Sequence, residues 1–238
     1  MNTNQPPRIF DDAHKTAEGS LAKNFVANVF SWMVVGLLIT GFVASYASSS
    51  GLYEQLVGSG GLMMWVILLA PFAFIIAMNA GLQKFSATTL TLLFLAFSGV
   101  MGLSLSSVFL VYSMGSITQV FLITAGTFAV MAFAGYTTSV DLSKFGALLF
   151  MALIGIIIAS VVNFFMQSSM MDFIISVGGV LVFTGLTAYD TQRIKRIGAG
   201  VEYGTAGATK LAILAAVSLY LNFVNLFLFL LRLLGGRN

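Results

Sequence analysis

The sequence lacks cysteine, has a single histidine and carries few charges. The absence of cysteine excludes disulfides, thiolate metal sites and a cysteine nucleophile. His14 lies in a polar N-terminal segment and is interpreted as a solvated residue. Charged residues make up 8% of the 238 residues, against about 25% in an average soluble domain. A soluble enzyme, a disordered protein and a nucleic-acid-binding protein are therefore excluded.

Hydrophobic residues make up 58% of the chain, and the mean hydropathy is +0.98. Even a soluble domain of about 300 residues buries only about 75% of its unfolded surface, so this composition indicates a polytopic membrane protein. A helix needs about 20 residues to cross the hydrocarbon core. Seven apolar runs have that length, and none has a charge in its centre. They span residues 25–47, 62–82, 86–112, 117–136, 145–166, 171–190 and 209–233.

The runs predict helices, because strands of a membrane barrel would alternate apolar and polar residues. The segment "MMWVILLAPFAFIIAM" does not alternate. The predicted fold class is an all-α integral membrane protein with seven transmembrane helices. Residues 1–24 form a polar cytosolic tail, and residues 25–238 form the transmembrane domain. No internal repeat indicates a transporter of two matching halves.

Basic residues predict the orientation, since cytoplasmic segments carry an excess of lysine and arginine. With the N-terminus inside and seven spans, nine basic residues lie inside and two outside, and the C-terminus is outside. Six spans would place the C-terminus inside. The inner residues are Arg8, Lys15, Lys23, Lys84, Lys144, Arg193, Lys195, Arg196 and Lys210, and the outer ones are Arg232 and Arg237.

Motifs of known enzyme chemistry are missing. The sequence has no HExxH motif, phosphate-binding loop or dinucleotide fingerprint. No aspartate pair or Ser/His pair lies within a span. We therefore expect neither an enzyme nor a cofactor.

Asp190 is the most informative single residue. It ends the sixth run in "VFTGLTAYDTQRIKR". An acid at membrane depth is a functional candidate, and Asp190 is the one candidate acid for a metal. The competing interpretation, slightly favoured by position, is a helix-end acid at the headgroup level that pairs with Arg193. Asp190 lies about 28 Å along a helix from Met171, close to the inner edge.

Polar residues of the last run form the second candidate group. Asn222 and Asn225 are three residues apart and share a helix face. Helix packing and a polar pathway explain them equally well. Asn222 lies about 18 Å along a helix from Lys210, so contact with Asp190 needs a tilted helix or a later helix start. Asp141 is expected to cap the fifth predicted helix.

Three separated segments resemble the Bax inhibitor-1 family, the transmembrane Bax inhibitor motif proteins. They are "GYTTSVDLSKFGALLFMALIGIIIASVVN", "GLTAYDTQRIKR" and "LYLNFVNLFLFLLRLLG". The resemblance covers the chain from about residue 25 and implies a bacterial member in the inner membrane. It implies that the last helix is central and surrounded by the other six.

The resemblance also implies a function, a passive calcium-permeable leak channel that senses pH. The expected partners are then the lipid bilayer and calcium ions. The alternative is a regulatory partner of a membrane-bound protease or another membrane complex, without ion conduction. Deleting the tail would abolish that second role and leave ion flux intact.

The family's sensor is a pair of aspartates that share a proton, because two carboxylates in contact cannot both ionise cheaply. Asp190 matches the first position, and Asn222 stands at the second. We therefore predict that Asp190 accepts a hydrogen bond from Asn222 and that pH gating is weakened or shifted. The family's latch is an arginine at the inner end of the second helix. Lys84 stands there without arginine's two-pronged fork, and Arg193 is the local alternative.

Overall fold

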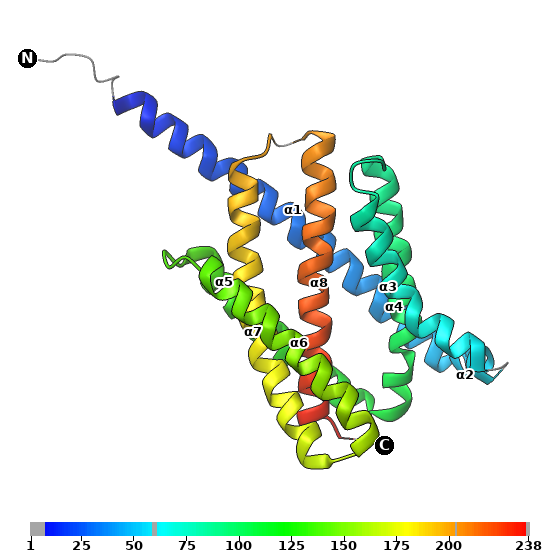
Figure 1. Cartoon of the computed structure of the whole chain (residues 1–238). Helices are drawn as coiled ribbons and strands as arrows, with labels where there is room; N and C mark the ends of the chain where they lie inside the picture. The colour runs from blue at the N-terminus through cyan, green and yellow to red at the C-terminus, as the bar shows by residue number, and fades with distance from the viewer. Residues whose placement is uncertain (1–7, 59–60, 203, 237–238) are drawn as a thin grey trace, which may run out of the picture.

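The computed structural model describes residues 8–58, 61–202 and 204–236, with side chains from Ser20 onward. This part of the chain folds into eight helices (Figure 1). They are α1 (Arg8–Ser49), α2 (Leu52–Gly58), α3 (Gly61–Ala80), α4 (Ala87–Val111), α5 (Met114–Thr137), α6 (Ser143–Met166), α7 (Ser169–Ala199) and α8 (Ala206–Leu234).

Seven of the described helices are long and apolar enough to cross a membrane, which confirms the predicted fold class. The exception is α2, a short helix in the first connector that the sequence did not predict. Serines set several starts: the side chains of Ser86, Ser113 and Ser168 each accept a backbone N–H of the following first turn. This capping explains why α4, α5 and α7 begin directly after these serines.

The sixth span is longer than predicted. The apolar run ends at Asp190, but α7 continues to Ala199. The added residues extend the helix by about 13 Å beyond Asp190. Three of them, Gln192, Lys195 and Arg196, find hydrogen-bond partners around the end of α5 and the α5–α6 loop. These contacts explain why the helix continues through a charged segment that ends the apolar pattern.

The first helix begins earlier in the chain than the first predicted span. α1 begins at Arg8, inside the predicted tail. Ala22 is buried and contributes to the core, so helix packing starts before residue 25. The cytosolic location of residues 1–24 stays a prediction.

Burial differs sharply between the last helix and α6. In the most apolar stretch of α8, 67% of the residues are buried, compared with 6% in α6. α8 packs against α1, α3, α4, α5 and α7, while α6 packs on α7. α8 is therefore the most enclosed span, and its enclosure by all six others stays a prediction.

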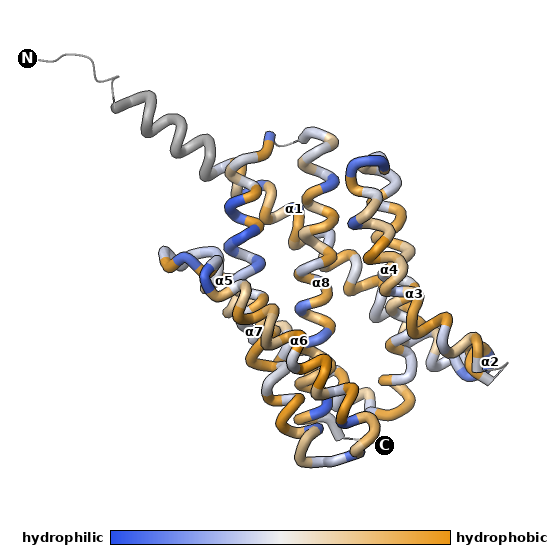
Figure 2. The backbone as a smooth tube through the Cα atoms, in the orientation of Figure 1, coloured by the Kyte–Doolittle hydropathy of each residue, from blue (hydrophilic) through white to orange (hydrophobic). Residues whose placement is uncertain are grey.

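Hydropathy follows this arrangement (Figure 2). The outlying α6 is hydrophobic along most of its length, whereas hydrophilic residues gather in the second half of α7 and in the middle of α8. α7 and α8 pack side by side. Two of these polar residues, Asp190 of α7 and Asn222 of α8, are buried within the bundle.

Candidate functional site

Asp190 of α7 and Asn222 of α8 form a buried polar pair. The Asn222 side-chain nitrogen Nδ2 donates to Asp190 Oδ2 at 2.7 Å. Asp190 is 8% exposed and Asn222 is 5% exposed. The expected hydrogen bond between them is therefore present. The role of this pair as a gate stays a prediction.

The length of α7 explains how the two residues meet. Asp190 lies nine residues before the end of α7 at Ala199, and Asn222 lies 16 residues after the start of α8 at Ala206. The interpretation of Asp190 as a helix-end acid is therefore wrong. The mismatch in depth between the two residues came from ending the sixth span at Asp190.

A buried contact on the opposite side of α8 holds Asn222 in place. The hydroxyl groups of Tyr220 and Thr40 lie 2.7 Å apart, and Thr40 donates to the Ser98 carbonyl at 2.8 Å. Tyr220 is fully buried, and the rings of Phe94 and Phe97 pack edge-on against it. This contact links α8 to α1 and α4, two residues before Asn222.

Two cavities meet at Asp190. The larger has a volume of about 760 Å³ and is lined by α3, α6, α7 and α8. The smaller, of about 320 Å³, is lined by α3, α7 and α8 and extends to Leu82 and Leu211, near the α3–α4 turn and the start of α8. Five residues line both cavities: Ile75, Asp190, Arg193, Ser218 and Leu221. Asp190 therefore lies at the junction of the two cavities, and Asn222 lines the larger one.

The other predicted residues lie around this junction. Arg193 is exposed and lines both cavities, and neither of the two salt bridges among the described residues includes it. Asn225 lines the larger cavity and donates to the Leu221 carbonyl of its own helix at 2.8 Å. Lys84 is exposed in the α3–α4 turn, and no ion pair joins it to Asp190 in the described part of the chain. The latch roles of Arg193 and Lys84 stay predictions.

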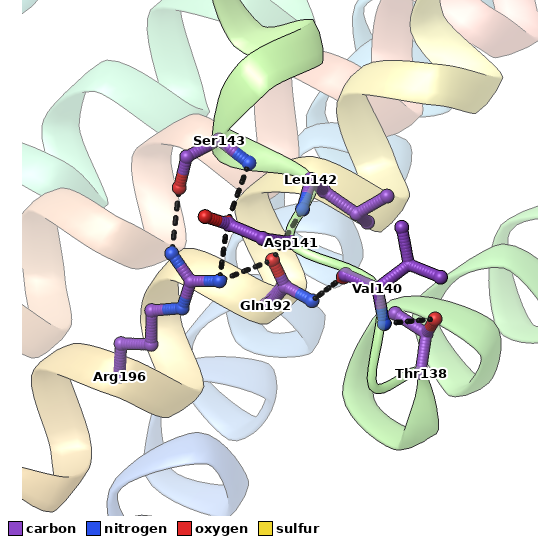
Figure 3. Close-up of polar contacts among 7 residues, drawn as sticks. All are labelled: Thr138, Val140, Asp141, Leu142, Ser143, Gln192 and Arg196. Atoms are coloured by element: carbon purple, nitrogen blue, oxygen red, sulfur yellow. Dashed lines mark hydrogen bonds and ion pairs between the residues drawn. The ribbon is translucent and has the colours of Figure 1, made fainter.

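Asp141 belongs to a second polar cluster, on the α5–α6 loop (Figure 3). Its Oδ1 accepts from the Ser143 backbone N–H at 3.0 Å, which satisfies a free donor at the start of α6. Arg196 of α7 donates to Asp141 Oδ1 at 2.6 Å, to Ser143 Oγ at 2.6 Å and to Gln192 Oε1 at 2.8 Å. Gln192 in turn binds the loop backbone at Val140 and Leu142. The cluster fastens the α5–α6 loop to α7.

The electrostatics of this cluster are those of an exposed ion pair. The hydrogen bond from Arg196 and those from Ser143 lower the pKa of Asp141 from its ordinary 3.8 to about 2. Asp141 is therefore ionised throughout the neutral range. It is a fixed charge near the end of the bundle.

Sequence reasoning missed Gln192 and Ser218. Gln192 follows two residues after Asp190 and is buried, with a full set of loop contacts. The spacing of Gln192 and Arg196, four residues apart, is the helical spacing that could have indicated that α7 continues. Ser218 precedes Asn222 by one turn and lines both cavities. Its position could have been found as a third polar residue on the same face of the last run.

A metal site of ordinary composition is not found here. Across residues whose side chains are described, no group of three or more His, Cys, Asp or Glu residues could hold a metal ion. Asp190 has an amide, rather than a second acid, as its partner.

The fold and this pair define an integral membrane protein of seven spans, with a buried carboxylate between its last two helices. The family described as inhibitor of apoptosis-promoting Bax1 matches residues 22–238. The chain belongs to this family, the Bax inhibitor-1 family, as its motifs predicted.

Curated relatives cover nearly the whole chain. The inner membrane protein YbhL of Escherichia coli (strain K12) is 46% identical over 216 residues, which are 90% of this chain and 92% of that protein. A protein of Borreliella burgdorferi is 45% identical over 229 residues, covering 96% and 99%. The protein RP147 of Rickettsia prowazekii is 38% identical over 229 residues, covering 94% of each.

Proposed function

We propose that the chain is a passive cation leak channel of the bacterial inner membrane, permeable to calcium, whose gate is the Asp190–Asn222 contact. The observation that carries this proposal is the position of Asp190 at the junction of the two cavities. A buried carboxylate in a membrane span is costly unless it serves a pathway or a partner. The inner-membrane location rests on the name of the E. coli relative.

The polar lining supports a pathway through this junction. Ser218, Asn222 and Asn225 place three polar side chains along one side of α8, next to Asp190. Asn79 lines the smaller cavity near the end of α3. Where α7 and α8 separate, the hydrogen bond between Asp190 and Asn222 breaks and frees the carboxylate oxygen for a cation. In this proposal, the pair closes the pathway when bonded.

The ligands available favour a leak over a tight binding site or a pump. Calcium takes six to eight oxygen ligands, preferably carboxylates. Asp190 supplies the one carboxylate at the junction, and the amide oxygens of Asn222 and Asn225 are weaker ligands. A cation held by so few charged ligands leaves quickly. Weak binding is what a passive pathway requires.

Proton sensitivity is expected to be weak in this chain. Asn222 carries no ionisable proton and occupies the position of the family's second aspartate. It already donates to Asp190 without any proton being taken up. Acidification therefore lacks the shared proton that would switch a pair of carboxylates.

Calcium flux into liposomes that hold the purified protein tests the proposal. We expect Asp190→Asn to lower the flux by about tenfold, equivalent to about 1.4 kcal/mol in the barrier, because the attracting charge is lost. The matched control is Asp172→Asn, the same change on the same helix. Asp172 is half-exposed in the first turn of α7 and lies 3.8 Å from Arg232.

Equal flux from the parent and Asp190→Asn, with both proteins folded, would contradict the gate. A parent protein that gives no more flux than empty liposomes at any pH would overturn the channel itself. The alternative role, regulation of a membrane-bound protease or another membrane complex, would then be favoured. The first residues of α1 support that role, because α1 starts at Arg8, inside the polar segment of residues 1–24.

A further inference from the structure

The larger cavity has an apolar wall. Its volume of about 760 Å³ is in the range of sites that enclose small molecules, about 300–1,000 Å³. Phenylalanines from four helices line it: Phe72 of α3, Phe150 and Phe164 of α6, Phe183 of α7 and Phe229 of α8. Its polar groups are few, and apart from Ser160 of α6 they lie near Asp190 and on the adjoining face of α8. The lining therefore suits a long hydrocarbon group better than water, which needs two to four polar partners.

This cavity is continuous with the lipid-facing surface. Phe72 on one rim and Ile157 and Phe164 on the other are exposed. They lie in spans, α3 and α6, whose outer faces contact the bilayer. The opening therefore faces bilayer lipid, whose hydrocarbon chains are narrow and flexible.

We propose that an acyl chain of a bilayer phospholipid enters between α3 and α6, occupies the larger cavity and ends against the Asp190–Asn222 pair. The headgroup stays at the membrane surface, and the chain replaces the water that a cation would need at the junction. The consequence for conduction rests on the proposed function. Occupancy by the chain does not, because it follows from the cavity and its opening alone.

The experiment measures occupancy directly, by quenching of tryptophan fluorescence with phospholipids brominated on their acyl chains. The chain has two tryptophans, Trp32 and Trp65. Both are replaced by phenylalanine, and one reporter is introduced as Phe183→Trp, in the cavity wall. The matched control is Phe97→Trp. Phe183 is 6% exposed and Phe97 is 0% exposed, but Phe97 packs against Tyr220 away from the cavity.

The upper reference is Trp65 in a Trp32→Phe protein, since Trp65 is 55% exposed on the lipid-facing surface. We expect the Phe183→Trp reporter to lose as large a fraction of its fluorescence as Trp65. The Phe97→Trp reporter is expected to lose much less. Quenching of Phe183→Trp no greater than that of Phe97→Trp would overturn the proposal. If Phe183→Trp does not fold, Phe229→Trp on the facing helix reports on the same cavity.

A second variant pair separates chain entry from general exposure to lipid. Ser160→Phe adds a ring inside the cavity, and the lost hydroxyl bonds only to the Ile156 carbonyl of its own helix in the described part of the chain. Ile158→Phe places the same ring on the exposed face of α6. We expect Ser160→Phe alone to reduce quenching of the cavity reporter. Equal quenching in both variants would overturn chain entry, whether or not the protein conducts calcium.

Discussion

The two sides of α8 are built differently. Toward α1 and α4, Tyr220 is fully buried, bonds to Thr40 and is surrounded by aromatic rings. On the other side, Asn222 meets Asp190 of α7 beside a cavity of about 760 Å³ that α3 and α6 also line. One side is closely packed, and the other has space.

This difference indicates which parts of the bundle can move. α8 is anchored through its packed side, and a shift there would break buried hydrogen bonds and aromatic contacts. α6 has a single buried residue, Gly146, and packs on α7. α3 has three buried residues, and α8 has 14, so separation of α6 or α3 exposes fewer buried side chains than a shift of α8. The packed side therefore gives stability, and the open side is where a change of state is possible.

The largest effect, on the free energy of unfolding, is expected from adding a methyl group to the closely packed contact between α1 and α4. A methyl group at Gly102 of α4 would lie 2.7 Å from the Thr40 carbonyl oxygen and 2.8 Å from Val43 Cβ, so α1 and α4 must separate. We expect Gly102→Ala to lower the free energy of unfolding by about 1–3 kcal/mol, the range for overpacked cores. The thermal midpoint in detergent measures the change.

Gly99→Ala is the control on the same helix. Nothing lies within 4 Å of the added methyl group there. Alanine is the better helix former by about 1 kcal/mol, so this change is expected to be neutral or stabilising. Equal midpoints for the two variants would show that the contact between α1 and α4 is not closely packed.

The spans were predictable because hydrocarbon thickness sets their length, and seven runs met it. The end of α7 could not be predicted in this way, because the last residues of this helix are polar. Gln192 and Arg196 are stabilised by a loop some 50 residues earlier in the chain, and an apolar pattern carries no information on such contacts. The short α2 falls outside the pattern because its seven residues are far fewer than a span needs.

The next largest effect is expected on the pH dependence of calcium flux, from a substitution at Asn222 beside the cavity. Asn222→Asp places two carboxylates at hydrogen-bond distance, and they cannot both ionise cheaply. We expect the variant to take up one proton as the pH falls, which restores a hydrogen bond and closes the pathway. Calcium flux should then depend on pH in the variant much more strongly than in the parent, measured between pH 5 and 8 in liposomes.

A variant with the same pH profile as the parent would contradict the pair as a gate. Asn225→Asp is the matched control. Asn225 lies one turn further along α8 and bonds to its own helix at Leu221, not to Asp190. The same substitution there should change the pH profile less.

The sequence predicted the polar pair of this site but not the cavities around it. The contact of Asp190 with Asn222 followed from the family motifs, which place both positions in a pair. The cavities did not, because their walls come from four helices far apart in the sequence. Phe72 and Phe183 look like ordinary lipid-facing or core residues in any single span. Only the packing of α3, α6, α7 and α8 gives them a shared surface.

The smallest effect is expected at Asp141, whose exposed pair with Arg196 contrasts with the buried Asp190. The pKa of Asp141 is lowered to about 2, so its contribution to stability is present above its ordinary value of 3.8 and is lost only as the pH falls toward 2. Between pH 5 and 8 the charge is constant. We therefore expect Asp141→Asn to leave calcium flux and its pH profile unchanged, and to change tryptic cleavage at Lys144 by about twofold or less, as for an exposed ion pair.

The partner residue provides the control for this last prediction. If Asp141 acts through the guanidinium, Arg196→Gln should expose the same loop at least as much, because it also removes the bonds to Ser143 and Gln192. The double variant should then add little to Arg196→Gln, since both changes remove one shared contact. A pH profile that shifts in Asp141→Asn would instead place proton sensing on the α5–α6 loop, and the contrast between the two aspartates would fail.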